Sequence, residues 1–194
     1  MKILTEILSW IGTILGSILL ALAIVIFLFQ PTVVNGPSME NTLHNQDKIV
    51  INKTQNIFHS VPDYEKIVII DSRVDRKRSF KDNVIDPIKY NLITYKFFFN
   101  EDKFSSDDEI FWVKRVIGRP NDIIKFQDNK VFRNGEELKE SYIKEEAYYE
   151  DAEIKVPDNC IFVMGDNRNN STDSRIIGCI PLRNVIGTYW FKLG

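Results

Sequence analysis

Two side chains in this sequence could act together on a carbonyl group. Ser38 lies in the short segment NGPSMENTL, and Lys114 lies in the apolar run IFWVKRVI. A serine hydroxyl becomes a strong nucleophile when an adjacent base takes its proton, and a neutral lysine amine can be that base. The two residues therefore indicate covalent catalysis by a serine and a lysine. A helix cap or a linker residue is the alternative for Ser38.

The surroundings of Lys114 decide whether it can act as a base. On a strand alternate residues share a face, so Lys114 would lie with Trp112 and Val116, and Arg115 with Val113. In one account one basic side chain reaches solvent and the other pairs with a carboxylate. In the other account Lys114 is desolvated, and burial lowers its pKa from about 10.4 to about 7–8. Such an amine could take a proton from a serine near neutral pH.

The polar run GDNRNNSTDSR, residues 165–175, follows an apolar strand and mixes carboxylates with guanidinium groups. Asp, Asn and Ser side chains can satisfy the backbone of such a loop, and its ion pairs could hold its shape. The Asp-x-Asn spacing also invites interpretation as a calcium loop. We expect no metal here, because the run lacks the closing glutamate of an EF-hand and its two arginines would repel the ion.

These three segments occur in the order of a known set of motifs. Ser38 within PSMENTL, Lys114 within KRVIGRPND, and the run GDNRNNSTDSR resemble the bacterial type I signal peptidases, a membrane-anchored Ser–Lys peptidase family. The resemblance covers the chain from its apolar N-terminal run to its last residues. It implies that Ser38 attacks the scissile carbonyl and forms an acyl-enzyme. It also implies that Lys114 is the general base and that neither histidine nor a cofactor takes part.

The resemblance implies further residues that support this site. Ser171 matches the family serine whose hydroxyl helps to orient the lysine. Two carboxylates and two arginines are expected to pair as structural supports: Asp166, Asp173, Arg115 and Arg175. The backbone N–H of Ser38 should stabilise the oxyanion. Some family members add a serine side chain two residues before the nucleophile, where this chain has Gly36 and therefore no side-chain donor.

The same resemblance implies exported preproteins as substrates, cleaved after a small-x-small site. The extended segment before Ser38 could pair with a substrate strand by β-augmentation. Apolar side chains around Gly36 and the lysine strand would then line shallow pockets: Val34, Met39, Leu43, Trp112 and Val113. Ordinary core packing is the alternative for each of these five side chains.

An apolar run without any charged residue, from Ile7 to Phe29, precedes the serine. At about 1.5 Å per residue it is long enough to cross a hydrocarbon core of about 30 Å. A cleaved secretory signal peptide is the alternative. Such a peptide has a shorter apolar region followed by a small-x-small site. Here Ala21-Leu22-Ala23 lies inside the run, so we expect residues 1–30 to form an uncleaved signal-anchor.

The flanking charges suggest an orientation for this anchor. Lys2 and the α-amino group lie on one side, whereas the other side has no Lys or Arg before Lys48. By the positive-inside rule the N-terminus is cytoplasmic. We therefore expect a single-pass protein of the bacterial plasma membrane with residues 31–194 on the outer face. Ser38 follows Phe29 by at most about 30 Å of extended chain, which keeps the reaction close to the bilayer.

The elements that must position these residues are mainly strands. We predict a mostly β, antiparallel catalytic domain of the signal-peptidase type on one N-terminal transmembrane helix. Residues 40–46 could add one short helix. Turns are expected at Asp128-Asn129 and Asn134-Gly135, and Asn121 stands where the family favours glycine, a position that suits φ > 0. The runs expected to be extended are 30–34, 48–52, 66–70, 110–117, 122–127, 130–138 and 160–165.

Residues 71–109 differ from the rest of the domain. DSRVDRKRSFKDNV is densely charged, NEDKFSSDDE is acidic and polar, and YNLITYKFFF between them could be a strand. The basic residues of the first part could contact anionic lipid headgroups. A solvated insertion loop is the alternative. The sequence assigns no purpose to this insertion.

The composition excludes several classes of protein. A net charge of -2 gives no indication of nucleic acid as a partner. The two cysteines, Cys160 and Cys179, exclude a disulfide-dense scaffold and leave one bridge or two buried thiols open. The lipid bilayer is the other expected partner, and no obligatory protein partner is implied. A self-cleaving Ser–Lys repressor would need a helix-turn-helix, which we do not find, and a non-catalytic β scaffold with a decayed site is the remaining alternative.

Overall fold

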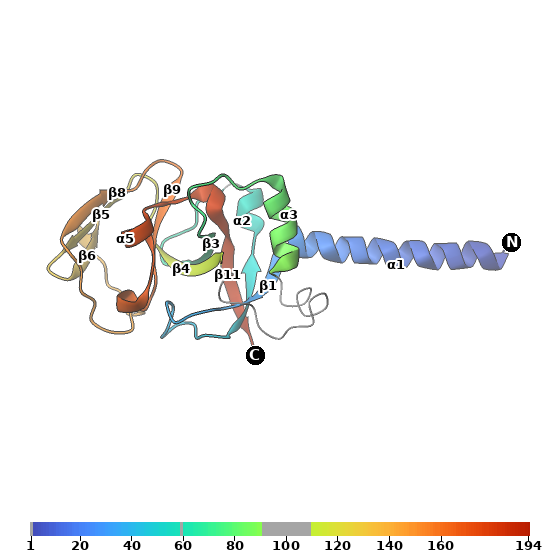
Figure 1. Ribbon diagram of the computed structural model, residues 1–194, viewed down its shortest axis with the longest axis horizontal. Coiled ribbons are helices and arrows are strands. Elements are labelled where there is room, and N and C mark those ends of the chain that lie inside the picture. The colour runs from blue at the N-terminus through green and yellow to red at the C-terminus, as the bar shows by residue number, and fades with distance from the viewer. Residues whose placement is uncertain (1, 59, 91–109) are drawn as a thin grey trace.

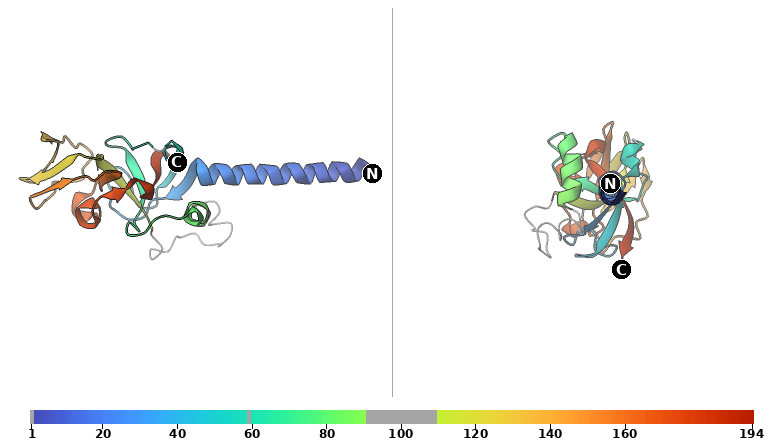
Figure 2. Two further views of the ribbon diagram at one scale, coloured as in Figure 1. Left: turned by 90° about the horizontal axis from the view of Figure 1, so that it is seen from above. Right: turned by 90° about the vertical axis from the view of Figure 1, so that its right-hand side faces the viewer.

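The structure, a computed structural model, describes residues 2–58, 60–90 and 110–194. Helix α1, Lys2–Phe27, is followed directly by a β domain (Figure 1). No residue of α1 is buried, and in the left view of Figure 2 it extends away from one end of the domain, while the right view looks along the helix from its N-terminus. By length and composition α1 could cross a membrane. The helix ends at Phe27, earlier than the expected Phe29, because Phe29 already begins strand β1.

A large antiparallel sheet forms the part of the domain next to α1. Its strand order is β1-β2-β11-β3-β4-β9-β10. The mostly β fold on one N-terminal helix is therefore confirmed. The β-branched runs predicted as strands around residues 48–52, 66–70 and 110–117 form three neighbours or near neighbours in it. The bounds of its strands are β1 Phe29–Val33, β2 Lys48–Asn52, β3 Ile67–Asp71, β4 Phe111–Gly118, β9 Cys160–Met164, β10 Ile180–Pro181 and β11 Val185–Leu193.

Strand β11 was not predicted, although it lies near the middle of the sheet. It pairs with β2 on one side and with β3 on the other. Gly187 makes the close approach to β2 possible, because a Cβ at this position would collide with the carbonyl oxygen of Asn52 and with the side chain of Ile51. The last strand in the sequence therefore connects β1 and β2, which follow the anchor, to β3 and β4, which carry Lys114.

A second antiparallel sheet lies at the end of the molecule far from α1 (Figure 1). Asp128 and Asn129 have φ of 51° and 59°, and Asn134 and Gly135 have φ of 52° and 87°, so both predicted turns are confirmed. Asn121 has φ of 72°, as expected for a residue in place of glycine. The order is β7-β6-β5-β8, with bounds β5 Ile123–Gln127, β6 Lys130–Arg133, β7 Glu136–Glu137 and β8 Ala152–Lys155.

The large sheet is buried on both faces. In β3, Ile67 and Ile69 join one hydrophobic cluster, while Val68 and Ile70 join another on the opposite face. This alternation is what the two-residue period of a strand requires, and β-branched residues on both faces explain why the run has no polar side. A third cluster lies between β9 and the second sheet. The strand that carries Lys114 is therefore fixed from both sides.

The structure corrects the helices expected outside the anchor. Residues 40–46 do not form a helix; successive turns replace it, including Glu40 N–H to Pro37 and Leu43 N–H to Met39. A helix instead occurs inside the charged insertion. This helix is α3, Phe80–Lys89. Other short helices complete the fold: α2 Thr54–Ile57, α5 Ser174–Ile177, and the 3-10 turns η2 Arg168–Asn170 and η3 Leu182–Asn184.

Helix α3 begins at a capping box formed by Ser79 and Asp82, a signal that was readable in the sequence but not used. The basic residues before it are engaged within the chain: Arg73 binds Asp71 and Asp86, and Arg76 binds Asp82. The described part of the insertion therefore consists of a partly exposed, ion-paired loop followed by helix α3. The strand suggested for YNLITYKFFF lies outside the described residues, apart from its first tyrosine.

Candidate active site

Ser38 and Lys114 meet in the structure across 76 residues of sequence. The Nζ atom of Lys114 donates a hydrogen bond to the Oγ atom of Ser38 at 2.8 Å. Lys114 comes from the middle of β4, and its side chain is only 3% exposed. Burial at this level disfavours the charged ammonium form of a lysine. The geometry therefore places an amine at hydrogen-bond distance from a hydroxyl in a desolvated position.

Several backbone contacts hold the turn that carries Ser38. Gly36 has φ of 80°, where glycine is favoured, and its N–H donates to Asn45 Oδ1 at 3.0 Å. Asn167 donates twice to the turn: its backbone N–H bonds the Ser38 carbonyl at 3.0 Å, and its Nδ2 bonds the Pro37 carbonyl at 3.1 Å. The polar run is thus hydrogen-bonded to the serine turn through Asn167. The sequence showed Asn167 in the run but gave no signal for these backbone partners.

Gly165, the first residue of the polar run, allows the run to lie against Ser38. A Cβ at Gly165 would lie 2.5 Å from the Ser38 carbonyl oxygen, and it would also collide with Ser171 Oγ. Ser171 and Ser38 therefore both border the same small space. This finding brings Ser171 to the site, as expected. The orienting role of its hydroxyl toward Lys114 stays a prediction.

Arg115 and Asp166 form the first of the two expected carboxylate–arginine pairs. Arg115 Nε donates to Asp166 Oδ1 at 2.8 Å, and its Nη2 to Oδ2 at 2.5 Å. Both residues are buried, and such a bidentate pair fixes geometry as well as charge. Thr42 Oγ1 also donates to Asp166, at 2.5 Å. Thr42, which sequence reasoning missed, ties the segment after Ser38 to the strand that carries Lys114.

Asp173 is the centre of the second pair. Its carboxylate accepts from Arg175 Nε at 2.8 Å, from Ser171 Oγ at 2.7 Å and from the Gly165 N–H at 2.9 Å. Burial acts to raise the pKa of Asp173, but the hydrogen bonds and the positive charge of Arg175 outweigh it, so the pKa lies below its usual value. An ionised Asp173 therefore fixes both Ser171 and the backbone next to Ser38.

A third buried ion pair, between Arg168 and Glu140, also stabilises the polar run. This pair was not predicted. Arg168 donates to both carboxylate oxygens of Glu140, at 2.8 and 2.5 Å, and its Nε donates to the Gly165 carbonyl at 2.9 Å. Arg168 was visible in the run, but Glu140 lies in an unremarkable charged segment. No sequence pattern linked the two residues.

The residues expected to line substrate pockets fall into two groups. Val34, Met39, Leu43 and Val113 are buried together in one hydrophobic cluster. Trp112 packs against the cluster on the other face, as strand alternation requires. Core packing, the alternative left open for these side chains, is what they show here. Their part in substrate binding stays a prediction, and Gly36 offers no side-chain donor to an oxyanion.

Cys160 and Cys179 are free thiols, which settles the alternative between a bridge and two thiols for this structure. Burial, together with the neighbouring Cys160, raises the pKa of Cys179 to about 11. The thiol is therefore protonated at neutral pH. Over residues 2–58, 60–90 and 110–194 no group of three or more His, Cys, Asp or Glu side chains gathers as a metal site would need.

Comparison with known proteins identifies a matching family model and several relatives. Residues 7–193 match the family model described as signal peptidase, peptidase S26. The chain is 30% identical over 198 residues to signal peptidase I S of Bacillus subtilis, covering 96% of this chain and 88% of that protein. It is 32% identical to signal peptidase I T of the same organism, covering 95% and 83%.

One further relative and one solved structure were also compared. The probable signal peptidase I-1 of Synechocystis is 30% identical over 94% of this chain and 80% of that protein. A crystal structure of a signal peptidase I from Enterococcus faecalis aligns with a TM-score of 0.43 at 23% identity, covering 66% of this chain and 97% of that one. Because the family model spans nearly the whole chain, this chain belongs to the signal peptidase family, peptidase S26.

Proposed function

We propose that this chain is a serine endopeptidase that removes N-terminal signal peptides from exported preproteins after a small-x-small site. One observation carries the proposal: the buried amine of Lys114 lies 2.8 Å from the hydroxyl of Ser38. A general base must be within hydrogen-bond reach of the proton that it takes, at about 2.6–3.2 Å. Membership of the signal peptidase family supports the choice of substrate.

In this proposal Ser38 Oγ attacks the scissile carbonyl while Lys114 Nζ takes its proton. The bond from Oγ to the carbonyl carbon forms, the peptide C–N bond breaks, and the proton passes from Lys114 to the leaving amine. Water then attacks the ester carbonyl, Lys114 takes a proton from it, and Ser38 is released with its hydroxyl restored. One amine therefore acts first as base and then as acid in each half of the cycle.

The oxyanion of each tetrahedral intermediate needs donors. The backbone N–H of Ser38 is the donor that we assign. Gly36 supplies no side-chain donor, so the stabilisation relies on backbone or solvent groups. Asn167 supports this arrangement, because its N–H bonds the carbonyl of Ser38, and Gly165 supports it because it has no Cβ to collide with that carbonyl.

The location of the site supports a substrate that emerges from a bilayer. Strand β1 follows α1 after a single residue, and Ser38 is nine residues past Phe29, which is at most about 30 Å of extended chain. Lys2 precedes the apolar run, whereas the next basic residue after it is Lys48, which favours a cytoplasmic N-terminus and a catalytic domain on the outer face. A signal peptide that leaves the same membrane would present its cleavage site at a similar distance from the bilayer.

The test is cleavage of a preprotein by the full chain in detergent. Ser38→Ala should abolish cleavage, whereas Ser141→Ala, which removes the same hydroxyl at an exposed position, should not. Mass spectrometry of the product identifies the cleaved bond. Substantial cleavage by Ser38→Ala, or cleavage by the wild type at a site without small residues, would overturn the proposal.

A further inference from the structure

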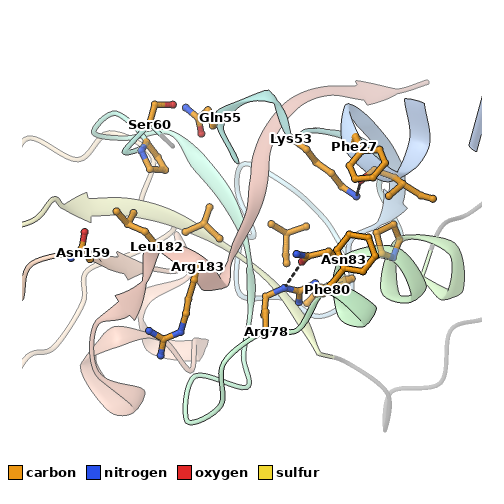
Figure 3. A pocket seen from close by; sticks show the side chains of 16 residues that line it. Phe27, Lys53, Gln55, Ser60, Arg78, Phe80, Asn83, Asn159, Leu182 and Arg183 are labelled. Carbon is orange, nitrogen blue, oxygen red and sulfur yellow. Dashed lines mark hydrogen bonds between the residues drawn. The ribbon is translucent and has the colours of Figure 1, made fainter. Parts of the chain in front are cut away.

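A groove of about 560 Å³ lies where α1 joins the β domain, away from Ser38 and Lys114. It lies between the last turn of α1, helix α3 and strand β11, and Figure 3 shows Phe27, Lys53 and Arg78 around its end near the anchor. Three cationic side chains line it: Lys53, Arg78 and Arg183. Among the described residues no Asp or Glu lines the groove. Its lining therefore favours an anionic ligand.

Lys53 is the unusual member of this lining. Its side chain is buried, and its Nζ donates to the carbonyl oxygens of Ile26 at 3.1 Å and Val25 at 3.5 Å, at the end of α1. A lysine ammonium has three donors, so these carbonyls do not use all of them. No carboxylate lies within ion-pair distance of Lys53 in the described part of the chain. A buried cation without a counter-ion is unfavourable.

The environment of Lys53 shows the effect of this missing counter-ion. Burial, and next to it the positive charge of Arg78, lower the pKa of Lys53 to about 7, while Asp86 acts in the opposite direction. An anion bound in the groove would reverse this shift and keep the amine charged. Arg78 differs, because its guanidinium is paired with both Asp71 and Asp86. Arg183 is exposed to solvent, so the buried charge without an acidic partner in the groove is that of Lys53.

The apolar part of the lining indicates what kind of anion would fit. Phe27 is the last residue of α1, and Phe80 at the start of α3 is 75% exposed, so two aromatic rings border the charged end of the groove. This end lies at the point where an apolar helix leaves the hydrocarbon core. A ligand with a phosphate and hydrocarbon chains matches both surfaces, whereas a free phosphate matches only the charge.

We propose that this groove binds one anionic phospholipid, with its phosphate paired to Lys53 and its first acyl carbons against Phe27 and Phe80. The lipid ties the end of the anchor to the β domain, because Lys53 contacts both the helix carbonyls and the phosphate. The proposal rests on α1 crossing the bilayer and not on the chemistry of Ser38. It assigns a ligand to a region that peptide cleavage does not explain.

The test uses the full chain in detergent, supplied with phosphatidylglycerol or with phosphatidylcholine, and native mass spectrometry to count retained lipids. Wild type should retain one phosphatidylglycerol with at least about fivefold preference over phosphatidylcholine, as expected for about 1 kcal/mol of charge attraction. Lys53→Met should lose this preference. Lys125→Met, which removes the same charge from an exposed position in the second sheet, should retain it.

Two outcomes would overturn the proposal: equal retention of both lipids by wild type, or an unchanged preference in Lys53→Met. Inorganic phosphate and glycerol phosphate separate the possible sources of the anion. If either displaces the lipid at equal concentration, the ligand is a free phosphate and the lipid assignment is wrong. If Lys53→Met does not fold, the preference of the wild type decides alone. Cleavage is not measured, so failure of the proposed peptidase mechanism would leave this result unaffected.

Discussion

Two lysines in this chain are almost equally buried, yet their partners differ. Lys114 is 3% exposed and Lys53 is 5% exposed. The amine of Lys114 contacts a serine hydroxyl at 2.8 Å, whereas the amine of Lys53 contacts a backbone carbonyl at 3.1 Å. A hydroxyl has a proton to give and a carbonyl has none. Burial can prepare an amine to be a base, but the partner determines whether it has anything to deprotonate.

The charges around the two lysines also differ. Next to Lys114, Arg115 is bound by Asp166, and the polar run is fixed by Asp173 and Arg168. This ion-paired frame neutralises its own charges and leaves the amine and hydroxyl in a defined position. Next to Lys53 the groove is open and its lining has no acid among the described residues. The first lysine is suited to a reaction and the second to a ligand.

Removing each amine gives the largest expected difference. Lys114→Met should lower preprotein cleavage by about 10³–10⁴-fold, because the general base is lost. Lys53→Met should retain at least about 100-fold more cleavage than Lys114→Met, because its carbonyl partners take no part in proton transfer. Cleavage rates in detergent measure both, with Lys125→Met as the matched control. Equal losses of cleavage in Lys114→Met and Lys53→Met would contradict the assignment of different roles to the two lysines.

Replacing each lysine with arginine sharpens the comparison. Arginine keeps the positive charge but is not deprotonated in proteins. Lys114→Arg should therefore lose cleavage as fully as Lys114→Met, while Lys53→Arg should keep its preference for phosphatidylglycerol within about twofold. The cleavage assay and native mass spectrometry give the two readouts. Cleavage by Lys114→Arg would show that charge, and not proton transfer, is what position 114 supplies.

A smaller effect is expected from the frame around Lys114. The folded-state pKa of Asp173 is lowered, so its contribution to stability is present above its ordinary value of 3.8 and is lost as pH falls through the folded-state pKa. Asp173→Asn should therefore remove part of the acid sensitivity of unfolding. At neutral pH it should cost at least about 2 kcal/mol, because Asn keeps only one of the two acceptor oxygens and Arg175 loses its buried counter-ion.

Denaturant unfolding of the full chain between pH 3 and pH 7 measures this effect. Asp151→Asn is the matched control, since Asp151 is exposed and its side chain makes no hydrogen bond to the residues that the structure describes. If the free energy of unfolding of Asp173→Asn depends on pH as that of wild type does, the ionised carboxylate of Asp173 is not what stabilises the polar run.

The strands that position Lys114 could be predicted from the sequence, because β2, β3 and β4 are short runs that contain several β-branched residues. Strand β11 could not, since its place between β2 and β3 depends on pairings with residues more than 100 positions away. Helix α3 was missed for another reason. It lies in a densely charged segment and contains Pro87, which argues against a helix, although the capping box of Ser79 and Asp82 marks its start.

The site divides in the same way. Ser38, Lys114 and the polar run were identified by residue type and order, and Asp166 and Asp173 pair with arginines as expected. The hydrogen bonds from Asn167 could not be predicted, because they end on backbone carbonyls that no residue type identifies. Lys53 was overlooked for the same reason: its acceptors are carbonyls of α1, 27 and 28 residues earlier in the chain.

The pH dependence of wild-type cleavage tests the central claim most directly. The buried amine of Lys114 must lose its proton before it can accept one from Ser38, so kcat/KM should rise with pH and then level off. We predict an apparent pKa for this rise well below the value of about 10.4 for a free lysine. A rate that stays negligible until the pH exceeds about 10 would contradict the assignment of Lys114 as a desolvated base.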